Sequence, residues 1–442
     1  MPVVVLPRWA GALAAAASLT VAGLATVSAE TVPAAAATSH VTASGPSVSP
    51  RFVKAHHAAS LPSGFTQVCP QPASPGVMRC SIVVHSQISV QPANKPASGS
   101  LSPGQLRSAY GLSQAAQASN KDTIAIVDAY NDWHATGDLA KYRSYYGLGA
   151  CKESTKCLRV VNQKGTTAWY PKGNSGWAEE ESLDLDMVSA ICPRCKILLV
   201  ESNATTAGSL SAAEATAVRL GAKFISNSWG GAEFSTETSY DSAFKHPGVA
   251  VTVAAGDYGY ADGSQWPAVN PDVTAVGGTT LWMKGKTRTE EKVWNLGAFD
   301  GTGSGCSAGL ETQQAWQNQY AGGDCAYRID NDVAADADPR TGPAVYDSYA
   351  PSGSGLPNGW QQLGGTSAAT PIIAAVYALA NPGGAPASAS LPTQFPYLAS
   401  SGLRDITIGS NGSCSGSFLC TAETGYDGPT GLGVPSGVNA FK

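Results

Sequence analysis

The chain has 442 residues, of which 43% are hydrophobic and 13% are charged, and its formal net charge is −5. This length suffices for one large domain with a full core. Because the charge is low and slightly acidic, we expect neither nucleic acid nor an anionic membrane surface as a partner. A low charge density also leaves few carboxylates to neutralise in acid, which favours tolerance of acidic media.

Residues 1–37 have the layout of a secretory signal peptide. Arg8 is followed by an apolar stretch over 9–27, and small residues follow at 27–29 and 34–37. We expect cleavage near residue 29 or 37 and a secreted, extracellular protein. The alternative is a membrane anchor, because the apolar stretch is about as long as the roughly 20 residues that span a bilayer.

Residues 38–101 are rich in proline, serine and alanine and show little hydrophobic periodicity, apart from a short apolar run at 82–84. Such a composition is typical of a short propeptide or linker. An ordered region is expected to begin at residue 102 and to continue to residue 442.

The ten cysteines form five pairs that are close in sequence, and an even number behind a signal peptide favours disulfide bonds. Pairing by proximity joins Cys69 with Cys80, Cys151 with Cys157, Cys192 with Cys195, Cys306 with Cys325, and Cys414 with Cys420. The alternatives are a redox pair at 192–195, or a zinc site formed with the cysteines at 151 and 157.

Beyond residue 102, strand-like and helix-like segments alternate. The predicted strands cover 123–128, 197–200, 224–228 and 249–255. The predicted helices start at 138, run through 183–191 and over 211–220, lie near 242, and cover 372–380. The strands are continuous apolar runs, which indicates that both faces of the sheet are covered. The pattern predicts an α/β fold with a doubly wound, mainly parallel sheet flanked by helices, and with chemistry at the carboxyl ends of its strands.

The segment 364–371 is suited to presenting a hydroxyl group to an extended peptide. Two glycines leave the backbone before Ser367 accessible, and an apolar helix follows. Pro371 fits the first turn of a helix, so this helix is expected to begin near Ser367. Ser367 is therefore a candidate nucleophile, although serine is also an ordinary helix N-cap.

Acidic side chains at two places could serve this hydroxyl. Asp257 follows a glycine at the end of the strand 249–255, where open α/β sheets bind ligands, although Gly-Asp is also an ordinary turn. Glu180 and Asp184 stand four residues apart on one helix and can touch. The alternative for this helix is a solvated acidic run at its N-terminus.

The histidines offer no setting typical of a catalytic base. His134 lies six residues after Asp128, and His246 precedes a proline in a predicted loop. A carboxylate is therefore expected to activate Ser367. An ordinary Ser-His-Asp peptidase that uses Asp128 is the alternative.

Three segments in order, Glu180-x-x-x-Asp184, 255–257 and 364–371, resemble the signature blocks of the sedolisins, which are serine-carboxyl peptidases with a subtilisin-like fold. Further matching stretches lie at 226–230, 277–279, 293–295 and 332–339. The resemblance covers 102–442 and implies that this region is a sedolisin-like peptidase domain.

The resemblance implies a role for each candidate residue. Ser367 would be the nucleophile, Glu180 the general base, Asp184 the carboxylate that orients Glu180, and Asp257 the group that stabilises the oxyanion. A protonated Asp257 would donate a hydrogen bond worth around 3 kcal/mol. Because Glu180 must then be ionised while Asp257 is neutral, we expect activity at roughly pH 3 to 5. Glu181, three residues from Asp184, remains an alternative base.

The implied substrate is a peptide or unfolded protein that lies extended beside residues 226–231 and pairs through its backbone. The expected substrate-binding residues are Ser226, Ser228, Trp229 and Gly230. The implied function is a secreted endopeptidase that acts through an acyl-enzyme on Ser367, as a monomer. The alternatives are a tripeptidyl exopeptidase, which the family includes, and an inactive homologue that serves as a binding module.

The C-terminal region offers carboxylate and carbonyl oxygens, which hard cations prefer. The resemblance implies a calcium-binding loop region that holds one structural Ca²⁺. The implied ligands are the carboxylates of Asp405 and Asp427 and the carbonyl oxygens of Ile406, Glu423 and Gly425. The family usually has glycine at position 423, and it usually has a folded prodomain far longer than 38–101.

Overall fold

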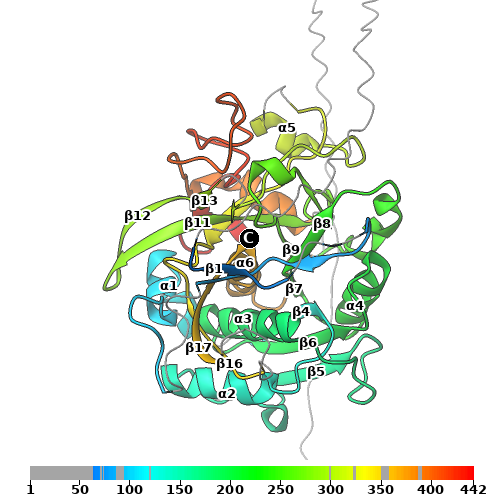
Figure 1. Ribbon diagram of the computed structural model, residues 1–442, viewed down its shortest axis with the longest axis vertical. Helices are drawn as coiled ribbons and strands as arrows, with labels where there is room; N and C mark the ends of the chain where they lie inside the picture. Colours follow the sequence, from blue (N-terminus) through cyan, green and yellow to red (C-terminus); the bar gives the residue numbers. More distant parts are fainter. Residues whose placement is uncertain are drawn as a thin grey trace, which may run out of the picture. The chain divides into compact units, whose positions relative to one another are not determined.

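A computed structural model describes residues 63–69, 72, 74–85, 94–118, 121–297, 300–321, 325–349, 358–386 and 391–442. Its central sheet has the strand order β12-β11-β9-β7-β4-β6-β5, and β15 also pairs with β11 (Figure 1). The strands are β4 (Thr123–Ala129), β5 (Leu158–Asn162), β6 (Lys196–Ser202), β7 (Phe224–Asn227), β9 (Ala250–Ala254), β11 (Thr274–Lys284), β12 (Thr287–Val293) and β15 (Val333–Asp336). All neighbours are parallel except β11 and β12, so the prediction of a mainly parallel sheet is confirmed.

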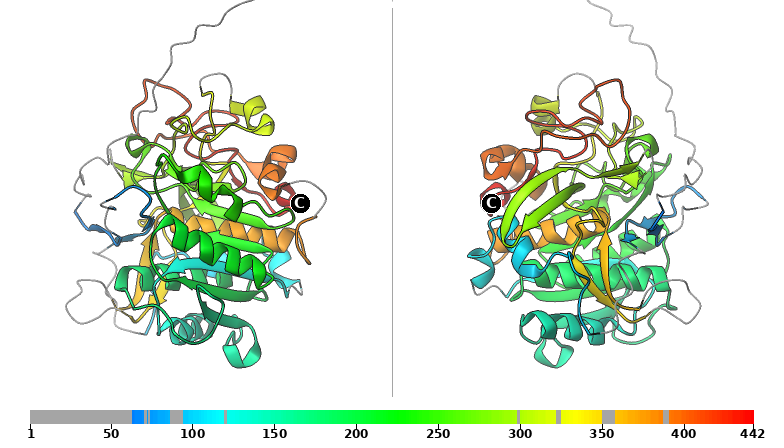
Figure 2. Two further views of the ribbon diagram at one scale, coloured as in Figure 1. Left: turned by 90° about the vertical axis from the view of Figure 1, so that its right-hand side faces the viewer. Right: turned by 60° about the vertical axis from the view of Figure 1, so that its left-hand side comes forward.

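The helices lie against strands that are buried on both faces, because every residue of β7 and β9 is buried. Helix α4 (Ala207–Arg219) packs on β4 and β6, while α3 (Ser175–Ile191) and α6 (Thr366–Ala380) pack on each other and on the sheet (Figure 2). The remaining helices are α1 (Pro103–Ala109), α2 (Ala135–Tyr146), α5 (Ala315–Ala321) and α7 (Phe395–Leu398). The helix predicted near residue 242 is a 3-10 helix over Glu237–Ala243.

Two smaller sheets flank the carboxyl ends of the central strands. One contains β1 (Phe65–Gln67), β3 (Val83–His85), β17 (Gly359–Gly364) and β16 (Ala344–Asp347) in that order. The other contains β10 (Gln265–Trp266), β8 (Trp229–Ala232) and β2 (Arg79–Cys80) in that order. Short pairs are formed by β13 (Asn295–Gly297) with β14 (Asp300–Gly301), and by β18 (Leu403–Arg404) with β19 (Val434–Pro435).

Strands β1, β2 and β3 come from the segment expected to be a propeptide or linker. Strands β2 and β3 pair with β8 and β17, which follow residue 102, while β1 pairs with β3, and all of them belong to the same compact unit of the chain. The range 102–442 therefore does not hold all strands of these sheets. The low periodicity of the segment hid them, because each strand has only two or three residues.

All five disulfide bonds predicted by proximity are present, from Cys69–Cys80 to Cys414–Cys420. No cysteine is free, so a zinc site built from thiolates is excluded. Among the described residues, no helix combines the length and apolar character needed to cross a membrane. The predicted signal peptide lies outside the described residues.

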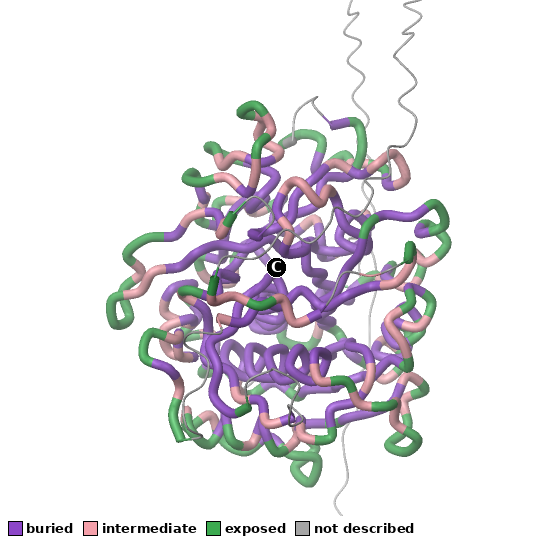
Figure 3. The backbone as a smooth tube through the Cα atoms, in the orientation of Figure 1, coloured by how far each residue is buried: buried purple, intermediate pink, exposed green. Residues whose placement is uncertain are grey.

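Helix α3 is buried along its length, as the purple tube in Figure 3 shows. Every residue from Gly176 to Ile191 is buried, including five acidic ones. The alternative of a solvated acidic run is therefore wrong. The helix begins after Asn174, whose side chain accepts hydrogen bonds from the backbone N–H groups of Gly176 and Trp177.

Buried carboxyl groups are a general property of this core. Burial raises the pKa of Asp128 and of Glu214 to about 8, and the pKa of Asp347 to about 7. The folded state therefore keeps protons that the unfolded state releases above its ordinary pKa values. The stabilising contribution of these groups is fully present below pH 4 and is lost as the pH rises toward 8.

We expect the melting temperature to fall between pH 4 and pH 8 at fixed calcium concentration. Glu214→Gln is the matched variant, because its amide is neutral at every pH and so releases no proton when the protein unfolds. It should reduce the loss of unfolding free energy over this range by roughly 1 to 4 kcal/mol. Calorimetry of both proteins at pH 4, 6 and 8 checks this, and a wild-type melting temperature that rises toward pH 8 would contradict it.

Candidate functional site

Ser367 is the second residue of α6, as the sequence predicts, and it is fully buried. The hydroxyl Oγ lies 3.2 Å from the carbonyl oxygen of Ser228, to which it donates, and it accepts from the N–H of Ser81 at 3.2 Å. Pro371 lies inside the helix and has no N–H to donate to the carbonyl of Ser367. The hydroxyl of Ser228 lies 3.4 Å from that carbonyl and supplies the missing donor.

Glu180 and Asp184 are brought to Ser367 by the packing of α3 against α6. Burial raises the pKa of Glu180 well above its ordinary value, and the charges of Asp184 and Asp128 raise it further. The hydroxyl of Ser367 lowers the pKa of Glu180, so it faces the carboxyl group. Neither carboxyl oxygen of Glu180 has a partner within hydrogen-bond distance. Both oxygens of Asp184 lie 2.8 Å from the hydroxyl of Ser228.

The three consecutive glutamates of α3 have different neighbours. After burial, the strongest influence on the pKa of Glu179 is Asp347, and on that of Glu181 it is Glu201. Of the three, only Glu180 has Ser367 among the groups that shift its pKa. This geometry favours Glu180 over Glu181 as the partner of the serine.

Asp257 follows β9 and Gly256, where the sequence predicts a ligand-binding group. Its Oδ1 accepts hydrogen bonds from the backbone N–H and the hydroxyl of Thr366, both at 2.8 Å. Its Oδ2 is buried and has no partner. Burial raises the pKa of Asp257 to about 6, with the bonds from Thr366 opposing the shift, so the carboxyl group is neutral in acid.

Gly365 shows where this free oxygen lies. A Cβ atom at Gly365 would be 2.7 Å from Oδ2 of Asp257 and 2.1 Å from the carbonyl oxygen of Ser81, so both oxygens border one position. The φ angle of Gly365 is +106°, which other residues rarely adopt. Glycine is therefore required at position 365, both because of the positive φ angle and because a Cβ atom would clash with these two oxygens.

The segment from Arg79 to His85 crosses the candidate nucleophile in an extended conformation. Arg79 pairs with Gly230 and Cys80 with Trp229, and the N–H of Ser81 donates to the carbonyl of Ser228 at 3.2 Å. The carbonyl of Ser81 accepts from the N–H of Ser367 at 3.0 Å. The hydroxyl of Ser367 thus stands beside the Ser81–Ile82 peptide bond.

Beyond this bond, Val83 and Val84 pair with Gly364 and Leu363 of β17, and with β1 on the other side. The sequence analysis missed this placement. The only signal was the apolar run 82–84 immediately after a cysteine.

Three of the four predicted substrate-binding residues contact this segment, namely Ser228, Trp229 and Gly230. The fourth, Ser226, lies in β7, where its backbone pairs with Ile126 of β4 and Thr252 of β9. Its hydroxyl is buried without a hydrogen-bond partner, and its part in substrate binding stays a prediction.

The described histidines do not support a Ser-His-Asp arrangement. His134 Nδ1 lies 2.9 Å from the hydroxyl of Ser348, and His246 Nε2 lies 2.8 Å from the carbonyl of Ala243. His85 stacks edge-on against Phe65. Asp128, which that alternative would use, instead raises the pKa values of Glu180 and Asp184.

The predicted calcium ligands gather in one loop region. Asp405 Oδ2 accepts from the N–H of Gly425 at 2.8 Å, and Asp427 Oδ2 accepts from the N–H of Glu423 at 3.2 Å. The other oxygen of Asp405 is buried without a partner. Burial raises the pKa of Asp427 to about 8. The charge of Asp405 also raises the pKa of Asp427, so the two carboxyl groups are near each other, and the free buried oxygen of Asp405 fits a hard metal ion.

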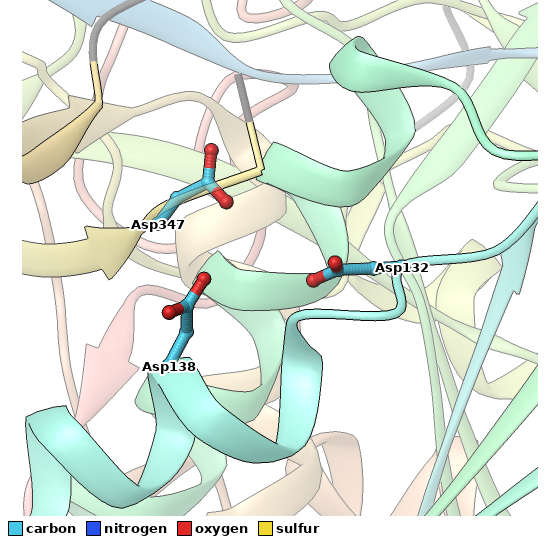
Figure 4. Close-up of side chains that lie close together, drawn as sticks. All are labelled: Asp132, Asp138 and Asp347. Carbon is cyan, nitrogen blue, oxygen red and sulfur yellow. The ribbon is translucent and has the colours of Figure 1, made fainter. Parts of the chain in front are cut away.

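A further acidic cluster was not expected from the sequence, because Asp347 is more than 200 residues from Asp132 and Asp138 along the chain. Asp132, Asp138 and Asp347 point toward one another from a loop, α2 and β16 (Figure 4). Each offers a carboxylate oxygen within 4.8 Å of the others. Burial, together with the charge of Asp347, raises the pKa of Asp132 to about 8. Such a cluster holds either protons or a cation.

Comparison with known proteins agrees with this geometry. The subtilase (peptidase S8) family matches residues 166–395, just over half of the chain. Kumamolisin from Bacillus sp. (strain MN-32) is 31% identical over 346 residues, which cover 72% of this chain and 59% of that protein. Sedolisin from Pseudomonas sp. (strain 101) is 28% identical over 365 residues, which cover 75% of this chain and 59% of that protein.

The chain thus spans about three fifths of the length of these two relatives. A solved structure of Pseudomonas sedolisin, a serine-carboxyl proteinase complexed with two molecules of pseudo-iodotyrostatin, is similar with a TM-score of 0.63 and 25% identity. The similarity covers 78% of this chain and 96% of that one. The chain therefore belongs to the subtilase family and is a sedolisin-like protein with a subtilisin-like fold.

Proposed function

We propose that this protein is a serine-carboxyl endopeptidase that hydrolyses peptide bonds at acidic pH through an acyl-enzyme on Ser367. The observation that carries the proposal is the position of the Ser81–Ile82 bond. Its carbonyl accepts from the N–H of Ser367, and the hydroxyl of the same serine stands beside it. A peptide held in this way is presented to the nucleophile as a substrate would be.

The chemistry follows from the neighbours of the serine. Burial raises the pKa of Glu180 while residues 79–85 cover the site, so Glu180 can ionise only once that segment is displaced and water reaches its carboxyl group. The ionised Glu180 then takes the proton of the Ser367 hydroxyl as Oγ bonds to the carbonyl carbon. The resulting oxyanion accepts hydrogen bonds from the N–H of Ser367 and from protonated Asp257. Glu180 then returns the proton to the leaving amine, and water releases the acyl group by the same steps. Asp184 positions Glu180, four residues away on α3.

The path of the chain favours an endopeptidase over a tripeptidyl exopeptidase. More than three residues before the Ser81–Ile82 bond are held by the protein. The N–H of Met78 donates to the carbonyl of Thr205 at 2.7 Å, and Val77 forms a bridge with Thr206. The segment also continues after the bond along β17. A cleft that accepts chain on both sides in this way is suited to bonds within a polypeptide.

We further propose that residues 1–37 direct secretion, and that 38–101 form a propeptide whose residues 79–85 cover the nucleophile until they are displaced. Five disulfide bonds suit an oxidising extracellular environment. The substrate would be a peptide or unfolded protein, and the enzyme would act as a monomer.

Replacing the candidate nucleophile and base should abolish activity. Ser367→Ala and Glu180→Gln are each expected to lower kcat/KM on an unfolded protein by roughly 10³-fold or more at pH 4. Glu214→Gln is the control, since it removes a buried carboxyl group of α4. Rates are measured with acid-treated full-length protein from pH 2 to 8. Loss of activity in Glu181→Gln with retention in Glu180→Gln would show that the base is misassigned.

A catalytically inactive homologue would give no turnover in any of these assays. An active-site titration separates the two cases, because an acyl-enzyme releases one equivalent of leaving group in a burst. A folded wild-type protein that gives neither a burst nor turnover at any pH would favour the binding module.

The upper limit of the pH profile should depend on Asp257. With a pKa of about 6, its carboxyl group loses the proton that it donates to the oxyanion as the pH rises past 6. In Asp257→Asn, the amide can donate at every pH while its oxygen still accepts from Thr366. We expect this variant to be slower at pH 4 but to retain its own rate to pH 7. A profile with the wild-type upper limit would assign that limit to another group.

We propose one structural calcium ion at Asp405 and Asp427, with the carbonyls of Ile406, Glu423 and Gly425 completing its ligands. Bound there, it would cross-link the loop and neutralise both carboxylates. Chelation at pH 6 should lower the melting temperature by several degrees. Asp405→Asn should be less stable and insensitive to chelation, whereas Asp132→Asn should keep the response to chelation. Equal melting curves with calcium and with chelator would refute this site.

A further inference from the structure

Arg79 is held in a closed pocket although its side chain is long and charged. Its side chain is only 4% exposed, and its Nη2 donates to Asp262 Oδ2 at 2.6 Å. Its guanidinium carbon lies 3.7 Å from the centre of the Tyr258 ring, as in a cation–π contact. Gln265 Nε2 lies 3.3 Å from the same oxygen of Asp262 and helps to fix that carboxylate.

The residues that contact the Arg79 side chain are part of the cleft and not of the segment 79–85. Tyr258 immediately follows Asp257, and Asp262 ends the 3-10 helix Tyr260–Asp262 before β10. Strand β10 pairs with β8, the strand along which Arg79 itself pairs. These groups therefore stay in place when another extended chain replaces the segment.

The register gives the pocket a defined position relative to the reacting bond. Arg79 is two residues before Ser81, whose carbonyl lies at the N–H of Ser367. In an extended chain, side chains two residues apart lie on the same side. A substrate in the same register would place the side chain of the residue two before the reacting carbonyl over Tyr258 and beside Asp262.

We propose that Asp262 and Tyr258 form a specificity subsite for a cationic side chain, arginine above all, two residues before the residue whose carbonyl is attacked. This proposal rests on the proposed endopeptidase function and names the residue class that the cleft selects. The Asp262 carboxylate is 12% exposed and accepts a 2.6 Å bond from Arg79. An acidic side chain at this position would therefore be repelled, and a neutral one would leave the partly buried carboxylate with only the bond from Gln265. Arginine is favoured over lysine, because its planar group stacks on the ring while it donates to the carboxylate.

The competing explanation is that Arg79 only anchors the propeptide and that substrates do not use the pocket. Peptides in trans separate these explanations. The probes are quenched peptides of sequence Val-Met-X-Ala-Ser-Ile-Val-Val, which follow residues 77–84 with alanine at Cys80. X is arginine, norleucine or glutamate. Norleucine matches the aliphatic length without the charge.

The acid-treated full-length protein is assayed at pH 5 for kcat/KM on each peptide. We expect arginine to exceed norleucine by about 10-fold or more, and glutamate to be poorest. In Asp262→Asn, the ratio of arginine to norleucine should fall toward one. Asp272→Asn is the matched control, because its carboxylate pairs with exposed Lys245, and it should keep the wild-type ratio. Equal rates for arginine and norleucine in wild type would overturn the subsite while leaving the endopeptidase function intact.

A binding measurement covers the case of an inert enzyme. In Ser367→Ala combined with Arg79→Gln, the nucleophile is removed and the cation no longer occupies the pocket. Fluorescence anisotropy with labelled peptides should show tighter binding of the arginine peptide, and this preference should disappear when Asp262→Asn is added. If no peptide is cleaved but the preference remains, the proposed catalysis fails and the subsite stands. If neither cleavage nor binding distinguishes the peptides, the subsite is wrong.

Discussion

The packing of α3 against α6 is the contact on which the site depends. It places Glu180 and Asp184 beside Ser367 and excludes water from all three side chains. Because Glu180 and Asp184 are buried without a basic partner, their pKa values are raised. While covered, they keep protons at pH values at which solvated carboxyl groups lose them. The other acidic faces of α3 meet different elements, since Glu179 faces Asp347 of β16 and Glu181 faces Glu201 of β6.

Much of the fold could be predicted because apolar runs such as those of β4 and β9 are long and unambiguous. The order of Glu180, Asp257 and Ser367 also marked the candidate site. Other features depend on tertiary contacts that leave little local pattern. Strands β2 and β3 are too short to show periodicity, and the acidic cluster joins Asp347 with residues 132 and 138, which are far from it along the chain.

Distance along the chain and distance in the fold differ at two places near the site. Ser226 and Ser228 are neighbours in a polar stretch, yet one lies within the central sheet and the other at the cleft. Their separation arises because β7 ends at Asn227 and the chain then enters a different sheet. Conversely, Asp257 and Gly365 are far apart in sequence, yet both border the carbonyl of Ser81.

Strands β2 and β3 each complete a sheet against a strand of the peptidase region. If this segment is displaced as proposed, β8 would lose a neighbour at Trp229 and Gly230, and β17 would lose one at Leu363 and Gly364. Their backbone groups then form open edges, which any extended chain with free amides and carbonyls can satisfy. A natively folded protein has already paired most of its own backbone, so it must unravel locally before it can dock. The sheet edges thus act as a filter for the conformation of the incoming chain, independently of its sequence.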